Sequence, residues 1–204
     1  AGVSEQRSSG WRCRWWKNYE GPELTLGPNF QYRETHPPDA DNTADAINFV
    51  SCVSCWGDQG SPFPPGFASN FAAHFDGVLH VDESGVYQFM VQHDQSAVLS
   101  IDGVAVVNGR CCSSGIGGSI SEKPLELEQG TPYHISVGYI QRTGGTFYAR
   151  AMWKQCESAV DCSAGVFSLI QGSATHGVSS SSFSEPRGGG VFIADAAAAN
   201  ISGL

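Results

Sequence analysis

The chain has 204 residues, of which 41% are hydrophobic and only 15% charged, so it holds enough apolar side chains for one sizeable core. Twenty acidic residues against 11 basic ones give a formal charge of −9, which disfavours nucleic acid as a partner because no basic stripe neutralises phosphates. No apolar run approaches the roughly 18 residues of a membrane span, so we expect no membrane insertion.

The predicted elements are strands, because apolar and polar residues alternate with a period of two. In chain order, Trp15 and Trp16 mark a first strand, and residues 104–109 form another after the Asp102–Gly103 turn. The alternating apolar sets are Tyr87, Phe89 and Val91; then Tyr133, Ile135, Val137 and Tyr139; then Phe147, Ala149, Ala151 and Trp153. Since no long segment keeps a helical period, we predict an all-β fold, an antiparallel twisted β-sandwich or barrel.

The composition changes after Trp153, which predicts two parts of the chain. Residues 11–155 form the β domain, and residues 156–204 form a short C-terminal extension rich in Ser and Gly. The extension ends in an apolar tail with Val191, Phe192, Ile193 and four alanines. We expect this tail to pack on its own domain or on a neighbouring subunit, so residues 173–204 are candidates for self-association.

Seven cysteines indicate an oxidising compartment, and therefore a secreted or cell-surface protein. Disulfides are favoured over a four-thiolate zinc site, because adjacent cysteines reach one tetrahedral ion poorly. Cys13 is expected to bridge to Cys156 or Cys162, and one cysteine stays free or bonds another chain. The remaining disulfide candidates are Cys52, Cys55, Cys111 and Cys112. Asn200 begins a glycosylation sequon, and Ala1 at the start fits a chain from which a signal peptide has been removed or one that has been trimmed.

A long central stretch, HFDGVLHVDESGVYQFMVQHDQSAVLSIDGVAVV, resembles the signature of the protective-antigen (PA-fourteen) domain of anthrax toxin, yeast flocculins, epithelial adhesins and some glycosidases. Flanking matches include Trp15, Asn18 and Tyr19, then residues 47–49, PPGFASNFAAHF, PLELEQGTPYHISVGY and TGGTFYARAMW. The likeness covers residues 11–153. It implies a twisted, barrel-like β-sandwich that is usually a non-catalytic module.

The resemblance also implies a ligand site. In sugar-binding members of this family, two adjacent aspartates joined by a cis peptide hold a calcium ion that binds sugar hydroxyls. Here Asp94 stands at the first position and Gln95 at the second, while the stretch with Arg142, Gly144 and Gly145 replaces a loop that brings an Asn in the relatives. Calcium at Asp94 is therefore one hypothesis, and a turn-forming Asp94 without metal is the favoured one.

Other motifs give weaker predictions. The acidic stretch 39–45 has oxygen ligands at alternate positions but lacks the Gly and Glu of a calcium loop, so we interpret it as a solvated loop. Trp56 lies in a Gly- and Pro-rich stretch and is a candidate platform for a sugar ring. His93 beside Asp94 has no nucleophile motif and is interpreted as a polar face residue. GIGGS at 115–119 lacks a following helix and is interpreted as a surface loop.

No catalytic set assembles from these residues, so we do not expect an enzyme. Two functional hypotheses remain. The first is a secreted glycan-binding or adhesion module with a carbohydrate partner. The second is a structural subunit of an extracellular assembly whose partner is another protein subunit.

Overall fold

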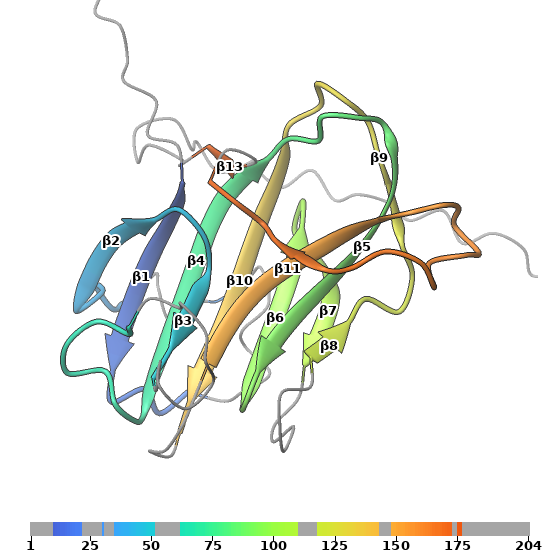
Figure 1. Cartoon of the computed structure of the whole chain (residues 1–204). Coiled ribbons are helices and arrows are strands. Elements are labelled where there is room, and N and C mark those ends of the chain that lie inside the picture. Colours follow the sequence, from blue (N-terminus) through green and yellow to red (C-terminus); the bar gives the residue numbers. More distant parts are fainter. Residues whose placement is uncertain are drawn as a thin grey trace, which may run out of the picture.

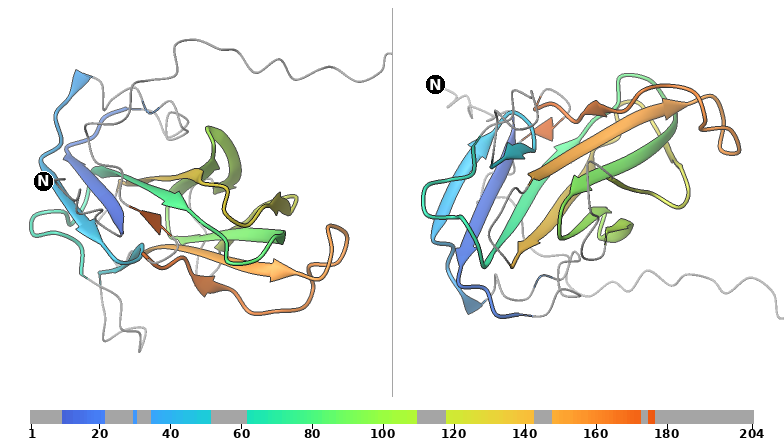
Figure 2. Two further views of the ribbon diagram at one scale, coloured as in Figure 1. Left: turned by 90° about the horizontal axis from the view of Figure 1, so that it is seen from above. Right: turned by 60° about the horizontal axis from the view of Figure 1, so that its bottom comes forward.

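The computed structural model of the protein describes residues 10–21, 30, 35–51, 62–109, 118–142, 148–172 and 175–176. All elements named within these ranges are strands, and they form two antiparallel sheets that lie in two layers (Figures 1 and 2). Both sheets are open, so the predicted all-β antiparallel fold is confirmed in its sandwich form rather than as a closed barrel. No helix among these residues is long and apolar enough to cross a membrane.

The first sheet has seven strands in the order β2-β1-β4-β10-β6-β7, with β13 paired to β4. Its strands are β1 (Trp11–Lys17), β2 (Ala40–Ala44), β4 (Phe71–Leu79), β6 (Ser96–Ile101), β7 (Val104–Gly109), β10 (Tyr133–Gln141) and β13 (Thr175–His176). The second sheet runs β12-β11-β5-β8, with β3 on β11 and β9 on β5. Its strands are β3 (Asn48–Val50), β5 (Gly85–His93), β8 (Gly118–Ile120), β9 (Leu125–Leu127), β11 (Tyr148–Cys156) and β12 (Ser168–Leu169).

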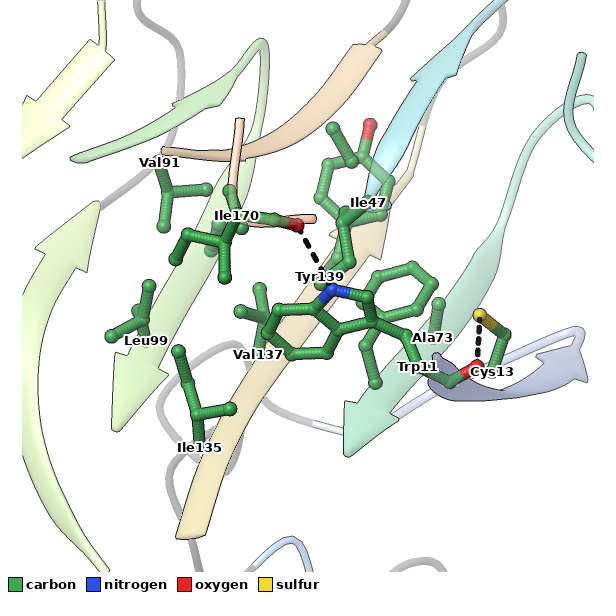
Figure 3. Packing of buried hydrophobic residues seen from close by; sticks show 14 of the residues in the cluster. Trp11, Cys13, Ile47, Ala73, Val91, Leu99, Ile135, Val137, Tyr139 and Ile170 are labelled. Carbon is green, nitrogen blue, oxygen red and sulfur yellow. Dashed lines mark hydrogen bonds between the residues drawn. The ribbon is translucent and has the colours of Figure 1, made fainter. Parts of the chain in front are cut away.

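The main core lies between the sheets and is built from the alternate residues that face inward. Trp15 lies at its centre, with its ring centroid 5.0 Å from that of Phe49 and 5.2 Å from that of Phe75, both edge to face. Near it, the buried indole N–H of Trp11 donates to the carbonyl of Ile170 at 3.2 Å (Figure 3). Burying such aromatic rings contributes strongly to stability through both their area and their edge-to-face contacts.

A second, smaller apolar cluster covers the outer face of the first sheet. Its residues are Trp16, Tyr19, Phe30, Ala72, Val98 and Ile140, all buried. Trp15 and Trp16 therefore pack on opposite faces of β1, as their adjacent positions in a strand require. The Trp16 indole N–H also donates to the carbonyl of His36 at 2.8 Å.

The turn at Asp102–Gly103 joins β6 to β7 with φ angles of 47° and 80°, which confirms the predicted two-residue hairpin. The Asp102 carboxylate accepts a hydrogen bond from the backbone N–H of His134 at 2.7 Å, so this turn is also tied to β10. Asp102 therefore combines the local preference of the hairpin with a contact from a distant strand.

The expected bridge between Cys13 and the C-terminal cysteines is not formed. Cys156 is bonded to Cys162, and Cys13 is a free, buried thiol. The reason is topological, because Cys13 faces the core from β1 in the first sheet while Cys156 ends β11 in the second. Beyond this disulfide, β12 pairs with β11 and β13 with β4, so part of the predicted extension belongs to the two sheets.

Candidate ligand site at one end of the sandwich

Several strand ends meet at one end of the sandwich. Asp94 and Gln95 form the turn between β5 of the second sheet and β6 of the first. The register pairs Ser96 at the start of β6 with Ile140 near the end of β10. It also pairs His93 at the end of β5 with Ala149 at the start of β11. The turn and the end of β10 are thus neighbours, as the resemblance implies for a ligand site.

Asp94 is held by two buried side chains of β10. The hydroxyl of Tyr139 donates to Oδ1 of Asp94 at 2.8 Å, and Nε2 of Gln141 donates to Oδ2 at 3.3 Å. Tyr139 is also within hydrogen-bond distance of Oε1 of Gln141. Burial first, and then the charge of Asp94, raises the pKa of Tyr139 well above its usual value, so its hydroxyl stays protonated and remains a donor.

Gln95 is held just as firmly as Asp94. Its Oε1 accepts a hydrogen bond from the backbone N–H of Arg142 at 2.7 Å, and its carbonyl accepts one from Nδ1 of His93 at 2.6 Å. Because a carbonyl only accepts, His93 carries a proton on Nδ1, and its Nε2 can accept from the hydroxyl of Ser119 at 2.9 Å. Burial lowers the pKa of His93 against the opposing effects of Gln95 and Asp94, in agreement with a neutral ring.

His93 is fully buried, so its interpretation as a polar face residue is wrong. It lies on the inward-facing side of β5 together with Phe89 and Val91, and its two ring nitrogens join the turn to β8. The alternation of β5 contained this information, because His93 continues the inward positions of the strand.

Arg142 ties this end of the sandwich to the segment that follows β1. Its guanidinium donates to the carbonyls of Tyr19 and Gly21 and lies 5.2 Å from the centre of the Tyr19 ring. Both its backbone and its side chain are therefore used in holding loops together. Of the predicted site residues, Gln95 is hydrogen-bonded to Arg142, and Asp94 beside it is bonded to the preceding residues of β10.

The described residues do not fit the calcium site that the resemblance suggests. Both oxygens of Asp94 already accept hydrogen bonds from buried donors of β10, and Gln95 stands where a second carboxylate would add charge to the ligand set. The Asp94–Gln95 peptide bond is trans, as are the other peptide bonds of the described ranges. Within those ranges, no group of three or more His, Cys, Asp or Glu residues could hold a metal ion.

The acidic stretch 39–45 is an edge strand rather than the predicted solvated loop. Residues 40–44 form β2 and pair with β1. Asp41 forms an ion pair of 2.7 Å with Arg12, and the Oδ1 of Asn42 accepts from the Trp15 indole at 2.8 Å. Three of the side chains that resembled calcium ligands, Asp39, Asp41 and Asn42, are thus partners of β1.

Sequence reasoning missed a buried charged group on the outer face of the first sheet. Oδ2 of Asp76 on β4 contacts Arg14 of β1 and lies 3.0 Å from Nδ1 of His74, while its Oδ1 lies 3.6 Å from Nε2 of His134 on β10. Burial by itself raises the pKa of Asp76. The opposing effects of His74, His134 and Arg14 together hold the pKa of this carboxyl well below its usual range. The available signal was the alternation His-Phe-Asp in β4, which puts two polar residues on one face.

Several predicted residues lie outside the described ranges, and the roles assigned to them stay predictions. They are Trp56, Gly144, Gly145, Cys52, Cys55, Cys111, Cys112, Asn200, residues 115–117 of the GIGGS stretch and the tail beyond residue 176. The last two residues of that stretch, Gly118 and Ser119, lie in β8 rather than in the predicted surface loop, because they pair with β5.

Solved structures of similar fold include an anti-sigma factor domain-containing protein from Clostridium clariflavum, at 16% identity and a TM-score of 0.58. The match covers 87% of this chain and 50% of that one, so the chain spans about half of its length. The PA14 sugar-binding domain of an RTX adhesin matches at 14% identity and a TM-score of 0.60, over 84% of this chain and 99% of that one. The A domain of Epithelial Adhesin 6 from Candida glabrata, solved with Galb1-3GlcNAc, matches at 13% identity and a TM-score of 0.61, over 85% and 88% of the two chains.

No curated protein matches the sequence. The family model of the PA14 domain, however, matches residues 36–159, which is more than half of the chain. This match includes the β5–β6 turn and the end of β10 that together form the candidate site. The chain therefore belongs to the PA14 domain family.

Proposed function

We propose that the protein is a secreted or cell-surface, non-catalytic module that binds glycans at the end of the sandwich around the β5–β6 turn. The observation that carries the proposal is that Asp94 and Gln95, adjacent in the β5–β6 turn, are hydrogen-bonded to the end of β10 and to Arg142 just after it, at the place where the family resemblance expects a ligand. Family members of similar fold support this choice, since one is described as sugar-binding and another was solved with a disaccharide.

The proposed ligand contacts are a rigid base with loop residues around it. The hydrogen bonds of Asp94, Gln95 and Arg142 fix the base, so little ordering of these side chains is needed when a ligand binds. Gly144 and Gly145 follow Arg142 after one residue, Thr143, and glycines allow a sugar to approach the backbone closely. Trp56 would stack on the apolar face of a sugar ring.

The test is a glycan array with the full chain, run with calcium and with a chelator. We expect a defined group of glycans to bind in both arms. Trp56→Ala should weaken this binding at least tenfold, while Val160→Ala, a change at a side chain that is 98% exposed in the 157–167 loop, should leave it unchanged. If no glycan binds with calcium or with the chelator, the proposal is wrong for the sugars on the array.

A structural role in an extracellular assembly is the second candidate. It is favoured by the apolar tail and by the exposed edge of β7, where Val104 is 66% exposed and a hollow of about 570 Å³ lies against Lys123 and Leu125. Sedimentation of the full chain and of a chain ending at His176 tests it, because that cut keeps β13 on its sheet. An assembly subunit would lose self-association on truncation, whereas a glycan-binding monomer would sediment as a monomer in both forms.

A further inference from the structure

We propose that Asp94, Tyr139 and Gln141 form a metal-free brace that holds the β5–β6 turn, and that this turn consequently binds no calcium. The inference does not depend on glycan binding, because it concerns what fixes the turn. It departs from the calcium site that the resemblance implies, and it rests on the direction of the hydrogen bonds around Asp94.

The first argument is the kind of group that faces Asp94. Both oxygens of its carboxylate accept hydrogen bonds, one from a hydroxyl and one from an amide N–H. Each of these donors takes one lone pair of Asp94, the single carboxylate of the turn, and so leaves fewer of its lone pairs for a cation. Tyr139 and Gln141 are 0% and 1% exposed, so moving them aside would leave buried groups without their partner. Calcium would be left with the remaining lone pairs of a single carboxylate, which is a weak ligand set for this ion.

The second argument is that the brace comes from rigid structure. Tyr139 and Gln141 are two residues apart on β10, so the strand period puts both side chains on its inner face. Figure 3 shows Tyr139 within the packed core, beside Val137 and Ala73. β10 is paired on both sides, with β4 and with β6, so the two donors are held in place without any ion.

The third argument is that the other oxygens of the turn are also in use. The side-chain oxygen of Gln95 accepts from the Arg142 N–H, and the Gln95 carbonyl accepts from His93. Calcium takes six to eight oxygen ligands. The side-chain oxygens of Asp94 and Gln95 and the Gln95 carbonyl thus already serve as acceptors for β5, β10 and Arg142.

The raised pKa of Tyr139 agrees with this arrangement. Burial and the nearby charge of Asp94 both favour the protonated phenol, which is the form that donates. The single proton of the hydroxyl has two acceptors within reach, Asp94 and Gln141, and the charged carboxylate is the stronger one. A network of this kind needs the charge on Asp94 and no counterion.

The experiment uses the full chain and two variants, Asp94→Asn and Asp102→Asn. Asp102 is the matched control, because it also lies in a hairpin turn next to β6 and accepts a backbone hydrogen bond, but at the opposite end of the strand. Calcium binding is measured by calorimetric titration with calcium chloride. The melting temperature of each protein is measured in calcium and in chelator.

We expect no binding heat at the turn and a melting temperature that differs by less than about 1 °C between calcium and chelator. Asp94→Asn should lower the melting temperature by several degrees to the same extent in both solutions, since its amide cannot accept from Gln141 as the carboxylate does. A calcium-induced rise that Asp94→Asn abolishes and Asp102→Asn retains would overturn the proposal. So would an Asp94→Asn protein as stable as the wild type in both solutions.

Two further outcomes have defined meanings. A calcium-induced rise that persists in Asp94→Asn, with that variant still destabilised, assigns the ion to another place and upholds the brace. If Asp94→Asn does not fold, the calcium titration of the wild type decides whether the turn binds calcium. Tyr139→Phe then replaces Asp94→Asn as the test of the brace. An array without bound glycans would remove the proposed function and leave these melting results unaffected.

Discussion

Asp76→Asn is the change that most directly tests how the first sheet is held together. Asp76 has a side chain that is 8% exposed and pairs with Arg14, at 18%, while its other partners are His74 and His134. The substitution keeps the size of the side chain but removes the charge and turns one acceptor into a donor. Arg14 and His74 would then face an amide in a buried place. The loss matters more because Nε of Arg14 and Nε2 of His74 already find no hydrogen-bond partner among the described residues.

The magnitude follows from burial. Breaking one partner of a buried ion pair costs about 3–5 kcal/mol, so we expect the free energy of unfolding to fall by about 3 kcal/mol or more. The neighbouring pair on β1 is the control: Arg12 and Asp41 are 31% and 38% exposed, and Asp41→Asn should cost about 0.2–1 kcal/mol. Both pairs join an Arg of β1 to an Asp of a neighbouring strand, and they differ in burial and in the two histidines that also contact Asp76.

Urea denaturation followed by tryptophan fluorescence measures both variants at neutral pH. The expected result is a large loss for Asp76→Asn and a loss near the error of the method for Asp41→Asn, with the slope of the transition unchanged. Similar losses in the two variants would refute the reasoning, because burial of the Asp76 group would then not decide its contribution.

Three other predictions follow from single contacts. The folded pKa of Asp76 lies below its usual 3.8, so the contribution of this carboxylate to stability is fully present above about pH 5 and is lost as the pH falls through the folded pKa. The urea midpoint should therefore fall from about pH 6 to pH 3 in the wild type and change less in Asp76→Asn. Burial and then the charges of Asp76 and Asp41 raise the pKa of Cys13 to about 12. Iodoacetamide should therefore label this buried thiol in urea and not in the native protein, and rapid labelling of the native protein would contradict its burial. A Cβ at residue 109 would lie 2.1 Å from Nε2 of His93, so Gly109→Ala should lower the stability of the protein by about 1–3 kcal/mol. The loss is measured as a lower melting temperature, and an unchanged melting temperature would argue against this close packing.

The strands and the class of the fold could be predicted because the signals are local. Alternating residues such as Tyr87, Phe89 and Val91 belong to one strand, and their period of two is a property of the extended backbone. The Asp102–Gly103 hairpin was equally local, since positive φ at two successive residues depends on those residues alone. The ordered motifs of the family added the sandwich arrangement.

Contacts between distant residues needed the tertiary structure. The partners of Asp94 are Tyr139 and Gln141, which lie 45 and 47 positions away and which the sequence presents only as members of a core strand. Residues 40–44 are polar enough to read as a loop, yet they pair with β1 because that edge of the sheet was open to them. The sequence by itself thus determined which segments are strands and which faces are apolar. The packing of the two sheets decided which donor each acid binds and which cysteine forms a disulfide. These contacts depend on distances in space, which cannot be read from the spacing of residues along the chain.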